Sequence, residues 1–101
     1  MEIVKSRNGV PIRLTEERWF HITEDHSEMA GYFFEVIETL QEPDAVYESK
    51  SGELLATKEI EFGKYLVVIY KEISKEDGFV ITAFLTRKIR QLERRTKLWP
   101  R

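Results

Sequence analysis

The sequence predicts an α+β fold in which two helices cover one face of a small antiparallel sheet. Two apolar runs, residues 65–70 and 78–86, favour the centre of that sheet because they are rich in β-branched and aromatic residues and have almost no polar gaps. The charged link between them ends in Asp77-Gly78, a dipeptide typical of turns. The predicted helices precede these strands along the chain, an order typical of helices gathered on one face of a sheet.

Composition limits the class of protein. The 101 residues suit one domain, residues 1–101, and 42% hydrophobic with 34% charged residues is typical of a globular chain. The absence of cysteine excludes disulfides, thiolate metal sites and a cysteine nucleophile. No window reaches the ~18 apolar residues of a membrane span, and the N-terminus lacks a signal-peptide pattern. We therefore expect a cytoplasmic protein that makes no use of a membrane.

The N-terminal half is expected to supply a hairpin and two helices. Asn8-Gly9 is the favoured two-residue turn, and Pro11 places the following arm at a sheet edge or outside the sheet. Thr15 is a good N-cap for a first helix over residues 16–23. A second helix, starting at residue 27, ends at Pro43. Its apolar stripe is expected to face the core and comprises Met29, Phe33, Val36, Ile37 and Leu40.

Residues 53–62 alternate between apolar and polar side chains, which predicts a strand with one buried face. Lys58 lies in the middle of the apolar side. Its neighbours on that side are Leu54, Ala56, Ile60 and Phe62. If Gly63-Lys64 forms a two-residue turn, Lys58 lies opposite Ile69 in the next strand. Whether Thr82 in the following strand shares this face stays open, because the long link leaves the register free by one residue.

Charge is distributed unevenly along the chain. Residues 87–101 contain one acid, Glu93, and seven basic residues: Arg87, Lys88, Arg90, Arg94, Arg95, Lys97 and Arg101. Because the whole chain carries −2, the +6 of this segment leaves −8 on residues 1–86. We expect residues 86–101 to form a basic C-terminal helix and a tail in which Leu98 and Trp99 fold back. Such a segment can bind a polyanion. The alternative is that it pairs with the chain's own carboxylates or is simply solvated, and both readings stay open.

Four residues are candidates for catalysis. His21 and His26 lie five positions apart, and histidine exchanges a proton near neutral pH, so the pair could serve as general acid and base. Lys58 could hold a phosphate, and the Thr82 hydroxyl could orient a substrate. The alternatives are surface or capping histidines, a lysine extending past its neighbours to solvent, and a hydroxyl satisfied within the fold. Histidines at this spacing do not share a helix face, so we expect no metal and no cofactor.

Several blocks in order resemble the phage-associated members of the barnase–EndoU–colicin–RelE-like (BECR) nuclease superfamily. Their pattern begins LT-x-x-R-W-x-H-I and continues with H-P-E, a Pro-Asp turn, a strand bearing Lys or Arg, a VVV strand and an ITAY-x-T strand. The matching residues are Leu14, Thr15, Arg18, Trp19, His21, Ile22, His26, Glu28, Pro43, Asp44, Lys58, Val67, Val68, Ile69, Ile81, Thr82 and Ala83. Ser27 stands where the family has Pro, and Phe84 stands where it has Tyr.

The resemblance implies two helices packed on a four-stranded antiparallel sheet. The fold we expect is therefore an N-terminal β-hairpin and two helices on such a sheet, followed by the basic C-terminal helix. The resemblance also implies metal-independent cleavage of RNA, commonly by a toxin of a prokaryotic toxin–antitoxin or phage system. RNA and an antitoxin protein are the partners that follow from it.

In the expected mechanism, His21 or His26 transfers the proton, Lys58 and Arg87 stabilise the phosphate, and Thr82 orients the substrate. The residues expected to follow the RNA backbone are Arg87, Lys88, Arg90, Arg94 and Arg95. The alternative is a non-catalytic nucleic-acid- or protein-binding module on the same fold. Convergence of the two histidines and Lys58 in one cleft would favour the enzyme, and their dispersal would favour the binding module.

Overall fold

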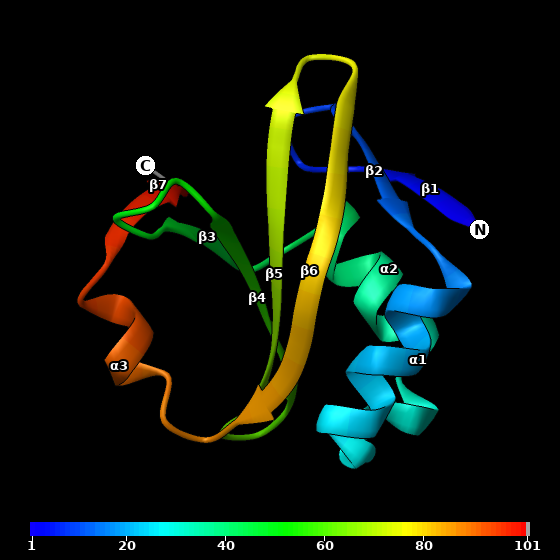
Figure 1. Ribbon diagram of the computed structural model, residues 1–101. Coiled ribbons are helices and arrows are strands. Elements are labelled where there is room, and N and C mark those ends of the chain that lie inside the picture. Colours follow the sequence, from blue (N-terminus) through cyan, green and yellow to red (C-terminus); the bar gives the residue numbers. More distant parts are fainter. Residues whose placement is uncertain (101) are drawn as a thin grey trace.

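A mixed sheet of seven strands organises the chain, and the computed structural model describes residues 1–100 (Figure 1). Arg101, one of the predicted basic residues, lies outside the described residues. The strands are β1 (Glu2–Lys5), β2 (Pro11–Leu14), β3 (Ala45–Glu48), β4 (Leu54–Glu61), β5 (Lys64–Ser74), β6 (Asp77–Thr86) and β7 (Thr96–Trp99). They lie in the order β1-β2-β6-β5-β4-β3-β7, and every neighbouring pair is antiparallel except β2 and β6.

Helices lie on both faces of the sheet. They are α1 (Glu16–Asp25), the 3-10 helix η1 (Ser27–Gly31), α2 (Phe33–Gln41) and α3 (Arg90–Glu93). Figure 1 shows α1 and α2 on one side of the sheet and α3 on the other. Thr15 caps α1 as predicted, because its hydroxyl oxygen accepts a hydrogen bond from the Arg18 amide at 3.0 Å. The predicted second helix is divided at Tyr32 into η1 and α2, and no helix within residues 1–100 is long and apolar enough to cross a membrane.

The expected four-stranded antiparallel sheet with two helices is wrong. Strands from both ends of the chain extend the sheet to seven, and α3 is a third α-helix. The predicted N-terminal hairpin does form, as β1 paired with β2. It joins the main sheet because β2 also pairs, in parallel, with the start of β6. Sequence patterns that describe single strands carry no information about such a pairing between distant segments.

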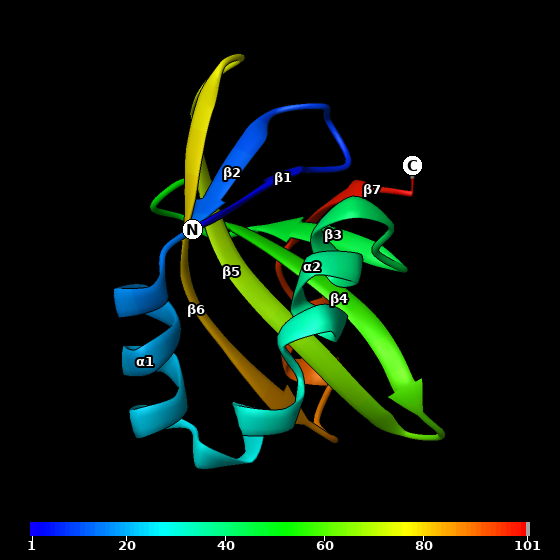
Figure 2. The same ribbon diagram turned by 90° about the vertical axis from the view of Figure 1, so that its right-hand side faces the viewer.

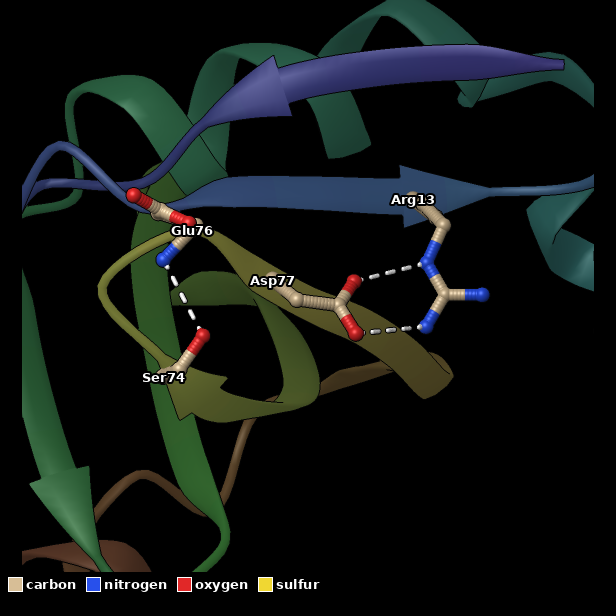
Figure 3. Close-up of polar contacts among 4 residues, drawn as sticks. All are labelled: Arg13, Ser74, Glu76 and Asp77. Carbon is tan, nitrogen blue, oxygen red and sulfur yellow. Dashed lines mark hydrogen bonds and ion pairs between the residues drawn. The ribbon is translucent and has the colours of Figure 1, made fainter.

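Two features fix the join between β2 and β6. The Arg13 guanidinium donates two hydrogen bonds to the Asp77 carboxylate, at 3.0 and 3.3 Å (Figure 3). Gly78 lies opposite Ile12, and a Cβ on Gly78 would lie 2.5 Å from the Lys71 carbonyl oxygen and 2.6 Å from Ile12 Cδ1. Only glycine allows the backbones to approach this closely. Asp77-Gly78 therefore serves the strand join. The turn predicted at this dipeptide is wrong, because Lys75 and Glu76 form the turn between β5 and β6 and Asp77 already begins β6.

The predicted basic C-terminal helix is wrong over most of its length. Only four residues form α3, and the following segment is β7, which pairs antiparallel with β3. The reason is that Glu93 to Thr96 offer no apolar stripe to hold a longer helix, whereas pairing with β3 satisfies the backbone of β7. The expectation that Trp99 folds back is confirmed, because its ring packs against the core and lies 4.6 Å from the Arg7 guanidinium carbon.

The main core lies between the sheet and α1, η1 and α2. The predicted stripe is confirmed, since Met29, Val36 and Leu40 are fully buried and Phe33 and Ile37 pack against the same cluster. Trp19 of α1 contacts Phe33 edge to face, with ring centroids 5.2 Å apart. These contacts place the helices firmly against one face of the sheet.

A smaller cluster lies on the opposite face, beneath α3. Its buried residues are Tyr47, Leu55, Val67 and Leu92, with Ala45, Ile69, Phe84 and Ile89 packed against them. Leu92 and Ile89 come from α3 and the residue before it, so this face is partly covered and not entirely open. The covering element is short, and the charged residues on either side of it remain exposed.

Candidate functional site

Lys58 and Thr82 lie on opposite faces of the sheet. Lys58 pairs with Leu66, which belongs to the core beneath α1 and α2, whereas Thr82 pairs with Ile69, which packs in the cluster beneath α3. The expected pairing of Lys58 with Ile69 is wrong. The β4–β5 turn consists of Phe62 and Gly63, and a register shift after Glu59 moves the partner of Lys58.

Lys58 is bound to the end of α2. Its Nζ donates a hydrogen bond to the Glu42 carbonyl oxygen at 2.9 Å and lies 3.7 Å from the Glu38 carboxylate. Helix C-termini have unsatisfied carbonyl oxygens and a partial negative charge, both of which attract a cation. The Lys58 ammonium therefore stabilises the end of the helix, and phosphate is not needed to explain its position.

His21 lies in the middle of α1, and His26 caps its C-terminal end. His21 is exposed, and its Nε2 lies 3.9 Å from the Glu17 carboxylate one turn earlier. His26 follows the last residue of α1, and its Nδ1 lies 3.7 Å from the Glu28 carboxylate. The His26 ring also lies 5.9 Å from the ring of Phe84 on β6. His26 therefore reaches the position at which the nuclease family has tyrosine.

The four predicted catalytic residues do not form one cluster. Within residues 1–100, no hydrogen bond, ion pair or ring contact joins His21 or His26 to Lys58, and Thr82 lies on the other face of the sheet from Lys58. The described residues also contain no group of three or more histidine or acidic side chains that could hold a metal ion. By the criterion of convergence, this dispersal favours the binding module.

A basic surface surrounds α3. Arg87, Lys88 and Arg90 line a groove of about 420 Å³ together with Tyr65 and Gly63. Arg94, Arg95 and Lys50 line a second groove of about 320 Å³ at the C-terminal end of the helix. Gln91 lines both grooves, so they are adjacent. We call the six cations the α3 basic surface: Lys50, Arg87, Lys88, Arg90, Arg94 and Arg95.

The cations of the α3 basic surface are not paired with carboxylates among the described residues. Among residues 1–100, none of its six cations forms an ion pair with a carboxylate of the chain. Acids lie nearby as well, namely Glu93 in α3, Glu48 in the second groove, Glu53 close to Arg95 and Glu59 close to Tyr65, so the surface is rich in cations but not free of acids. The described contacts do not show the basic segment paired with the chain's own carboxylates, whereas exposed cations without ion pairs fit both a solvated segment and a polyanion site.

Two members of this site were missed from the sequence. Lys50 lies in the loop after β3 and reaches the site only because β3 pairs with β7. Tyr65 looked like a core residue of an apolar strand, but it lines the first groove. Desolvation, with a further contribution from the Glu59 carboxylate, raises the pKa of Tyr65, so its ring stays neutral at physiological pH. A neutral aromatic ring beside cations suits base stacking.

No protein-family model, curated protein or solved structure matches the chain. The likeness to the BECR nucleases therefore stays a prediction, and function is inferred below from the residues of the chain itself.

Proposed function

We propose that this chain binds single-stranded RNA through the α3 basic surface. The observation that carries the proposal is the pair of adjacent grooves flanking α3, lined by six cations that have no carboxylate partner within residues 1–100. The RNA phosphates supply most of the affinity for such a surface, because lysine and arginine side chains that contact them release the counterions held by the RNA. The cytoplasm, where RNA is abundant, is the compartment that fits this function.

Single-stranded RNA fits the grooves better than duplex RNA. Unpaired bases can leave the stack and lie against an aromatic ring, and Tyr65 provides one in the groove that also contains Arg87, Lys88 and Arg90. Gln91 lies between the two grooves with an amide that can both donate and accept hydrogen bonds. Phosphate contacts from Arg94, Arg95 and Lys50 would then continue along the strand.

The test is the salt dependence of binding to a fluorescent poly-uridine oligonucleotide. Each lost single-strand phosphate contact lowers the log–log slope by about 0.7, so Arg90→Gln, Arg94→Gln and Arg95→Gln together should lower it by about 2. The matched control replaces Lys5, Lys71 and Lys75 by Gln, three exposed cations outside the surface. Equal slopes for both triple variants would contradict the proposal, because general positive charge would then explain the affinity.

Cleavage of the bound RNA is a second candidate, favoured by the position of His26. This imidazole lies against Phe84, three positions before Arg87, and Thr82 lies on the same face of the sheet as Phe84. His26 would exchange the proton while Arg87 holds the phosphate, as in a metal-independent toxin nuclease that is neutralised by an antitoxin protein.

The cleavage test incubates purified protein with mixed cellular RNA, with and without EDTA. Replacing a true acid or base should lower the rate by ~10²–10⁴-fold and leave RNA affinity almost unchanged. We expect His26→Ala to show this loss and His21→Ala to behave as the control, because the ion pair and the ring contact of His21 within residues 1–100 are with Glu17 and Phe20 of its own helix. Absence of cleavage by the wild-type chain would leave binding as the sole activity.

A further inference from the structure

Phe62 lies at the tip of the turn between β4 and β5. Its side chain is 99% exposed, more than any other large apolar side chain of residues 1–100. Figure 2 shows this turn at the lower right, projecting beyond the helices. A single exposed apolar residue is ordinary on a protein surface, so exposure alone assigns no role to Phe62. The surroundings of the turn give it one.

The turn holds the backbone of Phe62 in place. Glu61 and Lys64 pair on either side of the turn, and the Gly63 amide donates a hydrogen bond to the Glu59 carboxylate at 2.9 Å. Gly63 has a φ of 73°, a conformation that glycine adopts without strain. The Phe62 ring is therefore free of contacts but carried on a fixed backbone, so little conformational freedom is lost when a ligand covers it.

The turn lies at the mouth of the first groove of the α3 basic surface. Gly63 and Tyr65 line that groove together with Arg87, and a Cβ on Gly63 would lie 3.9 Å from Arg87 Nη1. Consecutive Cα atoms are about 3.8 Å apart, so Phe62 begins one residue beyond this contact. A nucleotide whose phosphate binds Arg87 can therefore lay its base against the Phe62 ring. A strand in the groove meets two aromatic rings, Tyr65 inside and Phe62 outside.

The charges at the tip favour a base there over a phosphate. Glu59 and Glu61 lie on the β4 side of Phe62, whereas the cations Arg87 and Lys88 lie on the groove side. A phosphate is repelled by the two carboxylates and attracted by the two cations. The uncharged base is then the part of the nucleotide that remains for Phe62, and burial of the exposed ring beneath it is favourable.

We propose that Phe62 is a base-stacking residue of the α3 basic surface and makes this site selective for single strands that contain an unpaired purine. The inference rests on the RNA binding proposed above and names the class of strand that the surface takes. Purines have a larger ring system than pyrimidines and stack more strongly on an aromatic side chain. Bases inside a duplex are already stacked and cannot reach the ring.

The test compares three short oligo-uridine strands that differ at one central position. That position holds 2-aminopurine, uridine or an abasic site. Binding of the first strand should quench the 2-aminopurine fluorescence, and Phe62→Ala should remove most of the quenching and lower affinity about tenfold. Affinity of Phe62→Ala for the abasic strand should equal that of the wild-type chain. The wild-type preference for 2-aminopurine over uridine should become smaller in Phe62→Ala.

Three further variants isolate the stacking. Phe34→Ala is the matched control, because Phe34 is 81% exposed but lies on α2, on the other side of the sheet from α3 (Figure 1). It should bind every strand as the wild-type chain does. Phe62→Tyr keeps the aromatic ring and should retain the affinity, whereas Phe62→Leu keeps only apolar bulk and should behave like Phe62→Ala. Because both phenylalanines are exposed, urea unfolding should be unchanged in all these variants.

Salt dependence separates this inference from the RNA binding on which it rests. Phe62→Ala removes no phosphate contact, so its log–log slope should equal that of the wild-type chain. Salt-dependent binding by the wild-type chain with equal affinity of Phe62→Ala for 2-aminopurine would overturn the stacking role and leave RNA binding in place. An equal loss on the abasic strand, an equal loss in Phe34→Ala or full affinity of Phe62→Leu would also overturn it. Absence of RNA binding by the wild-type chain would overturn both.

Discussion

The two faces of the sheet differ in how much apolar surface they bury. Beneath α1, η1 and α2, sixteen buried residues from all parts of the chain form one cluster within residues 1–100. Beneath α3 there are four, and the cations of the α3 basic surface surround them. Because buried apolar area supplies most of the folding free energy, the first face holds the fold together. The second face contributes less to stability and carries the exposed cations, so we look for ligand binding on that face.

The largest expected effect separates the faces directly. Leu40→Ala removes a fully buried side chain beneath the helices and should reduce the free energy of unfolding by about 3–5 kcal/mol. Leu92 lies in α3 at the margin of the smaller cluster, so Leu92→Ala should reduce the free energy of unfolding by about 2–3 kcal/mol. Urea unfolding measures both. Equal losses would show that the two faces contribute alike and would remove the distinction.

A second variant tests the strand join on the helix-covered side. Gly78→Ala should cost about 1–3 kcal/mol, because the new methyl group meets the Lys71 carbonyl oxygen and the Ile12 side chain. Gly31→Ala is the matched control, since a Cβ at Gly31 meets nothing within 4 Å. Urea unfolding should show little change for the control. A Gly78→Ala loss below half a kcal/mol would mean that β2 can shift without cost.

Lys58 tests whether a predicted catalytic residue belongs to the stabilising face. Lys58→Met keeps the aliphatic stem but removes the hydrogen bond to the Glu42 carbonyl oxygen and should cost about 0.5–1.5 kcal/mol. RNA affinity should be unchanged, because Lys58 lies on the opposite face from Thr82 and the cluster beneath α3. Thermal unfolding and RNA titration measure the two effects. Lower RNA affinity without a loss of stability would mean that Lys58 contacts RNA and would contradict this prediction.

The smallest effect concerns Tyr70, whose buried hydroxyl has no hydrogen-bond partner within residues 1–100. Tyr70→Phe removes an unsatisfied polar group and should be neutral or stabilising by up to about 1 kcal/mol at pH 7. Burial raises the pKa of Tyr70 above its ordinary value near 10. The stability associated with its protonated form is therefore complete below pH 10, begins to fall at the unfolded-state pKa and is lost as pH rises toward the higher folded-state pKa.

The same variant gives the matching pH experiment. Wild-type stability should fall more steeply than that of Tyr70→Phe when urea unfolding is measured from pH 9 to pH 11. Tyr47 and Tyr65, whose pKa values are also raised by desolvation, contribute equally to both proteins and cancel in the difference. Parallel curves would show that the Tyr70 hydroxyl is hydrated in solution.

Local features of the fold were predictable because they depend on neighbouring residues. The Thr15 cap, the N-terminal hairpin and the buried positions of Met29 and Leu40 follow from spacing and turn chemistry, although the hairpin turn is centred on Arg7 and Asn8 and not on Asn8-Gly9. The pairings of β2 with β6 and of β3 with β7 were not predictable, since they join segments far apart in the chain and depend on packing. The missing pairings explain why four strands were expected and seven are present.

The site was predictable in part for the same reason. A run of basic residues is visible in any sequence, so Arg87, Arg90 and Arg94 were identified. The partner of Lys58 in β5 depended on a turn one residue earlier than expected and on a register shift, and neither has a strong local signal. Lys50 entered the site only through the unpredicted β3–β7 pairing.

The parallel join of β2 to β6 has a consequence for synthesis. Arg13 and Asp77 are 64 positions apart, so a ribosome releases both N-terminal strands and α1 and α2 long before their partner strand emerges. Until then the apolar stripe of α2 has no sheet to cover, so it is exposed and prone to associate with other chains. Contacts of such long sequence separation also slow folding after release. We therefore expect stalled translation before β6 to produce an aggregation-prone chain rather than a partly folded one.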